Sequence, residues 1–136
     1  MVEDEGGSGE LTLDIDRATV LGDQHVTIRL AGELDPQTAP LLLDGVAGLD
    51  LDGVETLTIC CGDLTFLDSS GIQALVELRQ ATSQSEVAFR MTHLNQTQYR
   101  VLEITQLVDL LQASARSEDK LEEGCSARPA AIGLIE

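Results

Sequence analysis

The stretch from Asp63 to Leu75, DLTFLDSSGIQAL, constrains the fold most, because its pattern changes from strand to turn to helix within a few residues. Before it, apolar and polar residues alternate from Val54 to Cys61, which is typical of a strand with two different faces. After it, three apolar residues recur at helical spacing and share one face of a helix, and a charged residue follows on the same face: Ile72, Leu75, Val76 and then Arg79. The sequence therefore predicts a buried strand, an exposed turn and an amphipathic helix in direct succession.

The turn itself reads Asp68-Ser69-Ser70-Gly71. Asp and Ser are favoured at helix N-caps because their side-chain oxygens accept from the free N–H groups of the first turn, and Ser70 with Gln73 also fits a capping box. At least one hydroxyl should lie at the positive end of the helix. A phosphate added there brings roughly −1.5 to −2 charge, which helix amides tolerate and an acidic partner surface repels. A DSSG tetrapeptide taken alone is more often only a helix cap than a phosphorylation site that controls binding.

The charge balance restricts the kinds of partner. The chain of 136 residues holds 8 basic and 24 acidic side chains, a net charge of −16, so nucleic acid and anionic membrane are disfavoured as partners. No apolar run of about 18 residues and no secretory leader pattern occurs, and a cytoplasmic location is expected. Three cysteines without zinc spacing predict neither a disulfide framework nor a metal site, and no cofactor is expected.

The order of the remaining elements predicts one α/β domain. Residues 1–10 are acidic and glycine-rich and are expected to be flexible, residues 11–113 to form the domain, and residues 114–136 to form a tail. Alternation predicts strands over 11–16, 26–31, 54–61 and 87–92; helices are predicted from an Asp35 cap to about 50, over 68–82, and from an Asn95 cap through 107. Residues 108–111 fit either a short edge strand or a helix end.

These elements form a mixed four- to five-stranded sheet with helices mainly on one face. A first hairpin precedes two crossover connections, so the middle of the sheet should be parallel. Functional residues in such sheets gather where strands end and helices begin, and the turns at Asp35 and Asp68 are both of that type. The two acidic turns should therefore form a single surface.

With these two turns identified, the chain resembles the STAS family, specifically the bacterial anti-anti-sigma factors, also called anti-sigma factor antagonists. The resemblance is carried by AGELDPQTA at Ala31 to Ala39 and by DLTFLDSSGIQAL, in this order, and it covers roughly Leu11 to Leu111. Relatives often have Leu-Gly and a small residue where this chain has Ile72-Gln73-Ala74.

The resemblance implies a partner switch in transcription. By this analogy, an anti-sigma factor that is also a serine kinase phosphorylates Ser69, the unphosphorylated form binds that kinase and frees a sigma factor, and a PP2C-type phosphatase restores the unphosphorylated form. No direct nucleic-acid or membrane contact is implied. The implied partner-binding residues are Gly32, Glu33, Leu34, Asp35, Asp68, Ser69, Ser70, Gly71 and Ile72.

Other interpretations remain open at this point. A STAS domain can act as a scaffold or regulatory module without phosphorylation. A serine hydrolase is disfavoured because GxSxG is absent and no motif links His25 or His93 to Ser69. A phospho-aspartate receiver is disfavoured because the one lysine, Lys120, lies in the tail. The thiols of Cys60, Cys61 and Cys125 are expected to be structural, with Cys60 and Cys61 on opposite strand faces.

Overall fold

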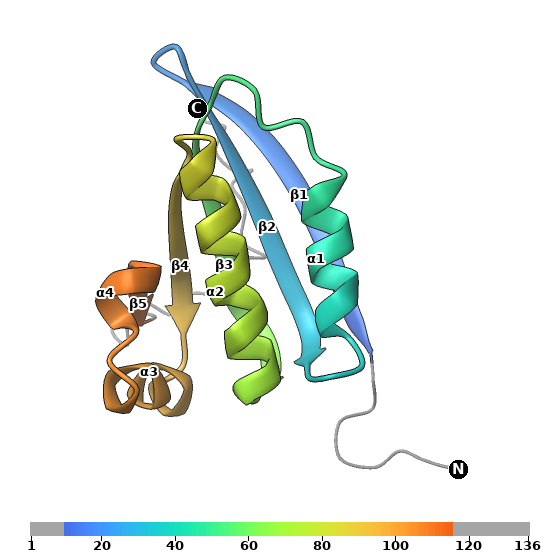
Figure 1. Ribbon diagram of the computed structural model, residues 1–136, viewed down its shortest axis with the longest axis vertical. Coiled ribbons are helices and arrows are strands. Elements are labelled where there is room, and N and C mark those ends of the chain that lie inside the picture. The colour runs from blue at the N-terminus through green and yellow to red at the C-terminus, as the bar shows by residue number, and fades with distance from the viewer. Residues whose placement is uncertain (1–9, 116–136) are drawn as a thin grey trace.

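The computed structural model describes residues 10–115, which form a five-stranded sheet in the order β1-β2-β3-β4-β5 (Figure 1). The elements are β1 (Leu11–Val20), β2 (Asp23–Leu34), α1 (Ala39–Ala47), β3 (Val54–Leu67), α2 (Ser69–Gln84), β4 (Ala88–Leu94), α3 (Gln96–Ile104), α4 (Val108–Leu111) and β5 (Ala113–Ala115). β1 and β2 are antiparallel, whereas all the other neighbours are parallel. The predicted mixed sheet with a parallel centre is therefore confirmed.

The antiparallel pair is closed by a tight two-residue loop. Val20 pairs with Asp23, and the loop residues Leu21 and Gly22 have φ angles of 53° and 88°. Positive φ at both positions matches the twist of the two strands, as in a type I′ hairpin, and glycine adopts that conformation without a steric penalty. The predicted short antiparallel connection is thus confirmed.

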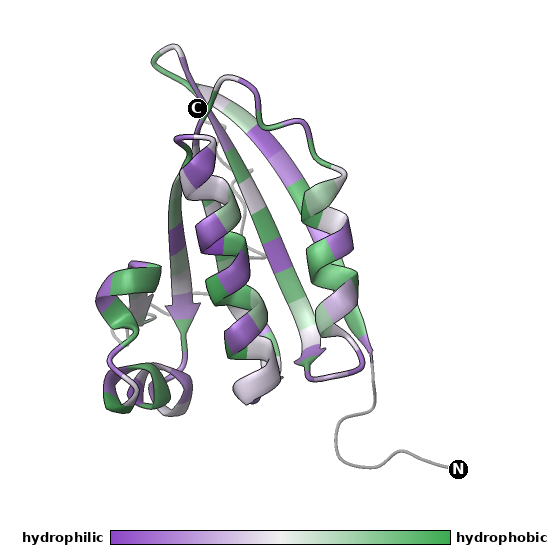
Figure 2. Ribbon diagram, in the orientation of Figure 1, coloured by the Kyte–Doolittle hydropathy of each residue, from purple (hydrophilic) through white to green (hydrophobic). Residues whose placement is uncertain are grey.

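The core lies between the sheet and two helices. Figure 1 shows α1 and α2 side by side over one face of the sheet, and Figure 2 shows the alternation of hydrophobic and hydrophilic residues along the strands. The buried strand residues on this face include Val26, Ile28, Leu30, Leu57, Ile59, Cys61, Phe89 and Met91, and the helices add Leu42, Val46, Ile72, Leu75 and Leu78. Burying one such side chain stabilises the fold by about 1.5–3 kcal/mol, so this one layer of contacts holds the domain together.

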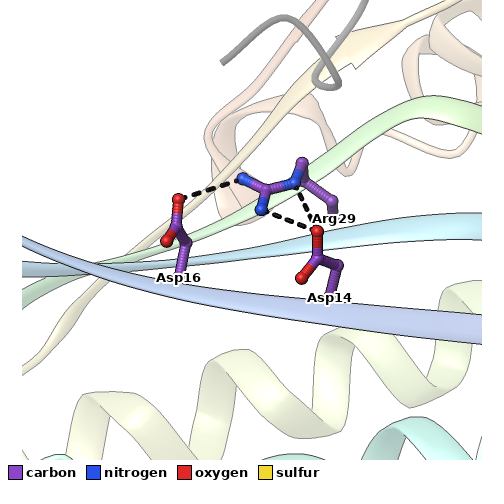
Figure 3. A network of polar contacts seen from close by, with 3 residues as sticks. All are labelled: Asp14, Asp16 and Arg29. Carbon is purple, nitrogen blue, oxygen red and sulfur yellow. Dashed lines mark hydrogen bonds and ion pairs between the residues drawn. The ribbon is translucent and has the colours of Figure 1, made fainter. Parts of the chain in front are cut away.

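The opposite face of the sheet is polar where β1 and β2 meet. Arg29 donates to Asp14 through Nε at 3.2 Å and through a terminal nitrogen at 2.7 Å, and it reaches Asp16 at 3.3 Å (Figure 3). Burial works against the charge on Arg29, but its hydrogen bonds to the carboxylates of Asp14 and Asp16 and the attraction of their charges outweigh this effect, and the pKa of Arg29 lies above its ordinary value. This network gives β1 one apolar and one charged face, as the alternation predicts.

Several predicted boundaries are wrong, for local reasons. β3 continues to Leu67, six residues beyond its predicted end, because the end of β2 pairs with it. α1 begins at Ala39, not after Asp35, because residues 35–38 close a separate turn. The Asn95 capping box of α3 is present, but α3 ends at Ile104. Residues 108–111 form the short helix α4, and the edge strand β5 follows it.

The cysteine pair lies as the alternation predicts. Cys61 is in the core on the helix side, where burial raises the pKa of its thiol to about 12, so the side chain is a neutral apolar group near pH 7. Cys60 lies on the other side of the strand, is 3% exposed, and has its Sγ 3.4 Å from His93 Nδ1. Cys60 is disulfide-bonded, so the expectation that it is a free structural thiol is wrong. Cys125, most of the predicted flexible N-terminus and nearly all of the predicted tail lie outside the described residues.

The described residues can be compared with the requirements of a membrane-spanning helix and of a metal site. None of their helices combines the length and apolar character needed to cross a membrane. Nor do residues 10–115 bring together three or more His, Cys, Asp or Glu side chains in a way that would hold a metal ion.

Candidate functional site

The site begins at the N-terminus of α2, which Asp68 caps. Asp68 has extended backbone angles, and its Oδ1 accepts a hydrogen bond from the Gly71 N–H at 3.1 Å, while its carbonyl accepts from Ile72 N–H at 3.0 Å. The predicted Asp68 cap is thus confirmed. The predicted alternative, a capping box from Ser70 to Gln73, is wrong because Ser70 already lies inside the first turn.

Both serines lie in that first turn, Ser69 at the first helical position and Ser70 at the second. Ser69 is exposed to solvent and Ser70 is half-buried. The hydroxyl of Ser69 is therefore accessible to another protein while it sits at the positive end of a 16-residue helix. This is the placement that the DSSG sequence predicts.

The two sequence motifs meet because β2 and β3 end side by side. Leu34 pairs with Leu67, Glu33 pairs with Phe66, and the Asp68 N–H donates to the Leu34 carbonyl at 3.4 Å. The carbonyl of Gly32, in turn, accepts from the Thr65 hydroxyl at 2.9 Å. The loop that ends β2 and the turn that begins α2 therefore form one edge of the sheet, as the strand order requires.

The backbones approach most closely at Gly71. A Cβ built on this residue would lie 2.7 Å from Leu34 Cγ, 2.8 Å from the Leu34 carbonyl oxygen and 3.0 Å from Leu67 Cδ1. Only a residue without a side chain fits there, so the first turn of α2 rests directly on the end of β2. This contact sets the position of Ser69 relative to Gly32 and Glu33.

The Asp35 turn is built around a buried carboxylate. Asp35 is 4% exposed, and its Oδ1 accepts from the Gln37 N–H at 2.9 Å and the Thr38 N–H at 3.0 Å. The Thr38 hydroxyl donates to the Glu33 carbonyl at 2.7 Å and accepts from the Asp35 N–H at 2.9 Å. The Asp35 side chain therefore holds the loop together from inside.

Asp35→Ala should therefore lower the stability of the domain. Losing an oxygen that accepts from two turn amides costs about 1 kcal/mol, in the manner of a lost helix cap. Asp35→Asn keeps one carbonyl oxygen at this position and should cost clearly less. Urea unfolding of both variants measures the difference. Equal stability of wild type and Asp35→Ala would show that the turn does not depend on this carboxylate.

Burial divides the expected binding residues into two groups. Leu34, Asp35, Gly71 and Ile72 are buried and shape the site from below, whereas Gly32, Glu33, Asp68 and Ser70 are half-buried and Ser69 is exposed. The surface that a partner can touch is thus narrower than the full set of motif residues, and the side chains it offers are acidic or hydroxylic.

One exposed residue of this edge was not singled out from the sequence. Phe66, which pairs with Glu33 at the end of β3, is 39% exposed. The sequence carries a usable signal, since the chain has only two Phe and one Tyr and no Trp, and this Phe lies three residues before Ser69. An exposed aromatic residue beside polar groups is typical of a binding surface.

The two histidines lie away from the Ser69 edge. His93 Nδ1 lies 3.0 Å from the Thr92 hydroxyl as well as near Cys60, and His25 is a half-buried residue near the start of β2. Among the described residues, no hydrogen bond links either histidine to Ser69. Neither histidine is therefore placed to act as a general base for the exposed Ser69 hydroxyl.

With this geometry established, the chain can be compared with known proteins. Its residues 17–123 match the family model described as the STAS domain. It is 28% identical over 96 residues to the anti-sigma-B factor antagonist of Bacillus subtilis strain 168, covering 71% of this chain and 87% of that protein. It is 24% identical over 106 residues to the anti-sigma-B factor antagonist of Staphylococcus aureus strain NCTC 8325 / PS 47, covering 78% of this chain and 98% of that protein.

Solved structures share the fold. An anti-sigma factor antagonist from Mycobacterium paratuberculosis is similar with a TM-score of 0.63 and 22% identity, over 82% of this chain and 91% of that one. SpoIIAA in its unphosphorylated form is similar with a TM-score of 0.59 and 20% identity, over 78% of this chain and 91% of that one. Its phosphorylated form gives a TM-score of 0.56 and 19% identity, over 79% and 95% of the two chains.

Proposed function

Since the chain belongs to the STAS domain family, we propose that it is an anti-sigma factor antagonist controlled by phosphorylation of Ser69. In this proposal the unphosphorylated protein binds an anti-sigma factor with serine kinase activity and so releases a sigma factor in the cytoplasm. Phosphorylation ends the binding, and a PP2C-type phosphatase restores it. The role is one of binding, and the protein itself catalyses no step of it.

The observation that carries the proposal is the position of Ser69. Its side chain is exposed at the first position of a capped helix, and the end of β2 lies next to it through the hydrogen bond from Asp68 N–H to the Leu34 carbonyl. A kinase can therefore reach the hydroxyl, and a partner that covers it also touches Gly32 and Glu33. Modification and binding then compete for one surface.

The physical basis of the switch is the charge already present at this edge. Glu33 and Asp68 flank Ser69, while the five arginines of residues 10–115 lie on other parts of the fold, at positions 17, 29, 79, 90 and 100. A phosphate gains the favourable field of the helix N-terminus but finds no arginine in either loop. The modified edge thus becomes strongly anionic without a change of fold.

Phe66 provides the apolar part of the proposed surface. Interfaces draw much of their affinity from a few aromatic or arginine residues that become fully desolvated, surrounded by polar contacts. Phe66 lies beside Glu33 at the rim of the Ser69 site and is partly exposed in the free protein. A partner that buries its ring gains apolar contact close to the hydroxyl on which phosphorylation acts.

The direct test is phosphorylation by the cognate anti-sigma kinase with ATP. We expect one phosphate per chain at Ser69, because Ser69 is exposed and Ser70 is half-buried. Intact-mass and peptide mass spectrometry give the number of phosphates and their position. Ser69→Ala should remove the phosphate, and Ser70→Ala should retain it.

The same experiment distinguishes the proposed phosphorylation switch from the alternative function, that of a STAS scaffold without phosphorylation. A STAS scaffold that is not phosphorylated would bind its partner and gain no phosphate, with Ser69→Ala indistinguishable from wild type in every assay. Phosphate found on Ser70, or on a serine outside the two loops, would also contradict the proposed switch.

A further inference from the structure

A groove lies at the free edge of β4, away from the Ser69 site. It has a volume of about 390 Å³, and its walls come from α2, the start of β4 and the α4–β5 segment. Arg79 and Ser83 contribute from α2, Arg90 contributes from β4, and Gln112 contributes from the residue before β5. We call this the arginine groove.

The groove gathers positive charge in an acidic protein. Of the five arginines among residues 10–115, Arg17 donates to the Asp50 carbonyl and Arg29 pairs with two carboxylates. The side chains of Arg79 and Arg90, by contrast, make no hydrogen bond or ion pair with any described residue, although the Arg79 carbonyl accepts from the Thr82 hydroxyl. No described Asp or Glu lines the groove either. In a chain with net charge −16, two arginines in a groove without a described carboxylate favour an anionic occupant.

The groove also contains an open strand edge. β5 pairs with β4 only at Met91 and Leu94, and the Met91 N–H donates to the Gln112 carbonyl. Because strand amides alternate in direction, the Phe89 N–H points to the same side as that of Met91. No described strand pairs with β4 there. An open edge of this kind favours docking of a polypeptide segment over a simple ion.

The sequence after β5 has the matching charge. Residues 118–123 read EDKLEE, with acidic pairs Glu118-Asp119 and Glu122-Glu123 on either side of Lys120 and Leu121, so the segment carries a net charge of −3 from four acidic residues and one lysine. Gln112 lines the groove three residues before Ala115, where the described chain ends, so that end is within about 10 Å of the groove at the rise of a strand. A segment tethered this closely has an effective concentration in the mM range.

We propose that residues 118–123 of the chain dock in the arginine groove, with their carboxylates on Arg79 and Arg90. Leu121 then meets the apolar wall formed by Val87 and Leu110. Docking pairs the two free arginines and covers the open edge of β4, which removes a place where other chains could add a strand. The groove lies near the C-terminal end of α2, whereas Ser69 lies at its N-terminal end, and the proposal does not depend on phosphorylation.

Proteolysis at Lys120 can measure this docking. Lys120 is the only lysine, so a lysine-specific protease cleaves the full chain at one place, in the middle of the acidic segment. The rate is divided by that of the free peptide SEDKLEEG under the same conditions. We expect the wild-type chain to be cleaved more slowly than the peptide, and the protection to fall as salt is raised.

The variant Arg79→Gln with Arg90→Gln should raise the relative rate about fivefold, since two exposed ion pairs are lost. Arg100→Gln removes a third arginine, which lies on α3 outside the groove, and it should leave the rate unchanged. Circular dichroism of each variant checks that the domain is folded. Cleavage of the wild-type chain at the peptide's rate would overturn the proposal. Equal protection in the double variant would overturn it as well, because the segment would then dock elsewhere.

Discussion

Ser69→Glu should weaken binding of the anti-sigma factor by about a hundredfold, whereas Ser69→Ala should bind nearly as tightly as wild type. A charge placed against an acidic rim in a covered interface costs several kcal/mol through repulsion and desolvation, and about 2.8 kcal/mol corresponds to a hundredfold. Glu33 and Asp68 supply that rim, and no described arginine lies in either loop. Isothermal titration calorimetry with the purified anti-sigma factor measures the change.

A matched control separates local charge from total charge. Ser85→Glu adds the same charge at the exposed C-terminal end of α2, about the full length of the helix away from Ser69. It should leave the affinity within about twofold of wild type, because exposed charges at such distances are screened. If Ser69→Glu bound as tightly as Ser85→Glu, the electrostatic switch at Ser69 would be refuted.

Gly71→Ala should lower the free energy of unfolding by about 2 kcal/mol, although alanine is the better helix former. Helix propensity alone favours alanine by up to about 1 kcal/mol. The added methyl group, however, would lie 2.8 Å from the Leu34 carbonyl oxygen and 2.7 Å from Leu34 Cγ, and overpacking against backbone in a close contact costs about 1–3 kcal/mol. The clash dominates because a carbonyl in a paired strand cannot move aside as a side chain can.

Gly48→Ala is the control for this prediction. Gly48 follows α1 with φ of −84°, and a Cβ there meets nothing closer than 3.7 Å. Its unfolding free energy should stay within about 0.5 kcal/mol of wild type. Urea unfolding of the two variants gives the comparison. Wild-type stability of Gly71→Ala would mean that α2 is not held against β2 at this point, and the rigid placement of Ser69 would lose its support.

The predictable part of the site is the part governed by local chemistry. Asp68 caps α2 and Ser69 lies exposed in its first turn because a strand, an Asx cap and an apolar helical face follow one another directly in the sequence. The Asn95 cap of α3 was predictable for the same reason. The start of α1 was not, because Asp35 and Thr38 form a turn whose hydrogen bonds reach back to Glu33.

Burial of the motif residues depended on distant partners. An aspartate in a loop is usually exposed, yet the carboxylate of Asp35 is buried inside the turn that it stabilises. A phenylalanine in a strand is usually a core residue, yet Phe66 is partly exposed at the sheet edge. Alternation along a strand indicates which residues share a face, but it does not indicate where the covering helices stop.

The sequence by itself determined the types of the elements before residue 108, the mixed sheet and the exposed serine, because periodicity and capping act over a few neighbouring residues. Only the tertiary structure decided which motif residues reach the surface, how Gly71 presses α2 onto β2, and that Arg79 and Arg90 share one groove. Those features arise from contacts between residues far apart in the chain. Their energies depend on packing and on strand register, which no local pattern encodes.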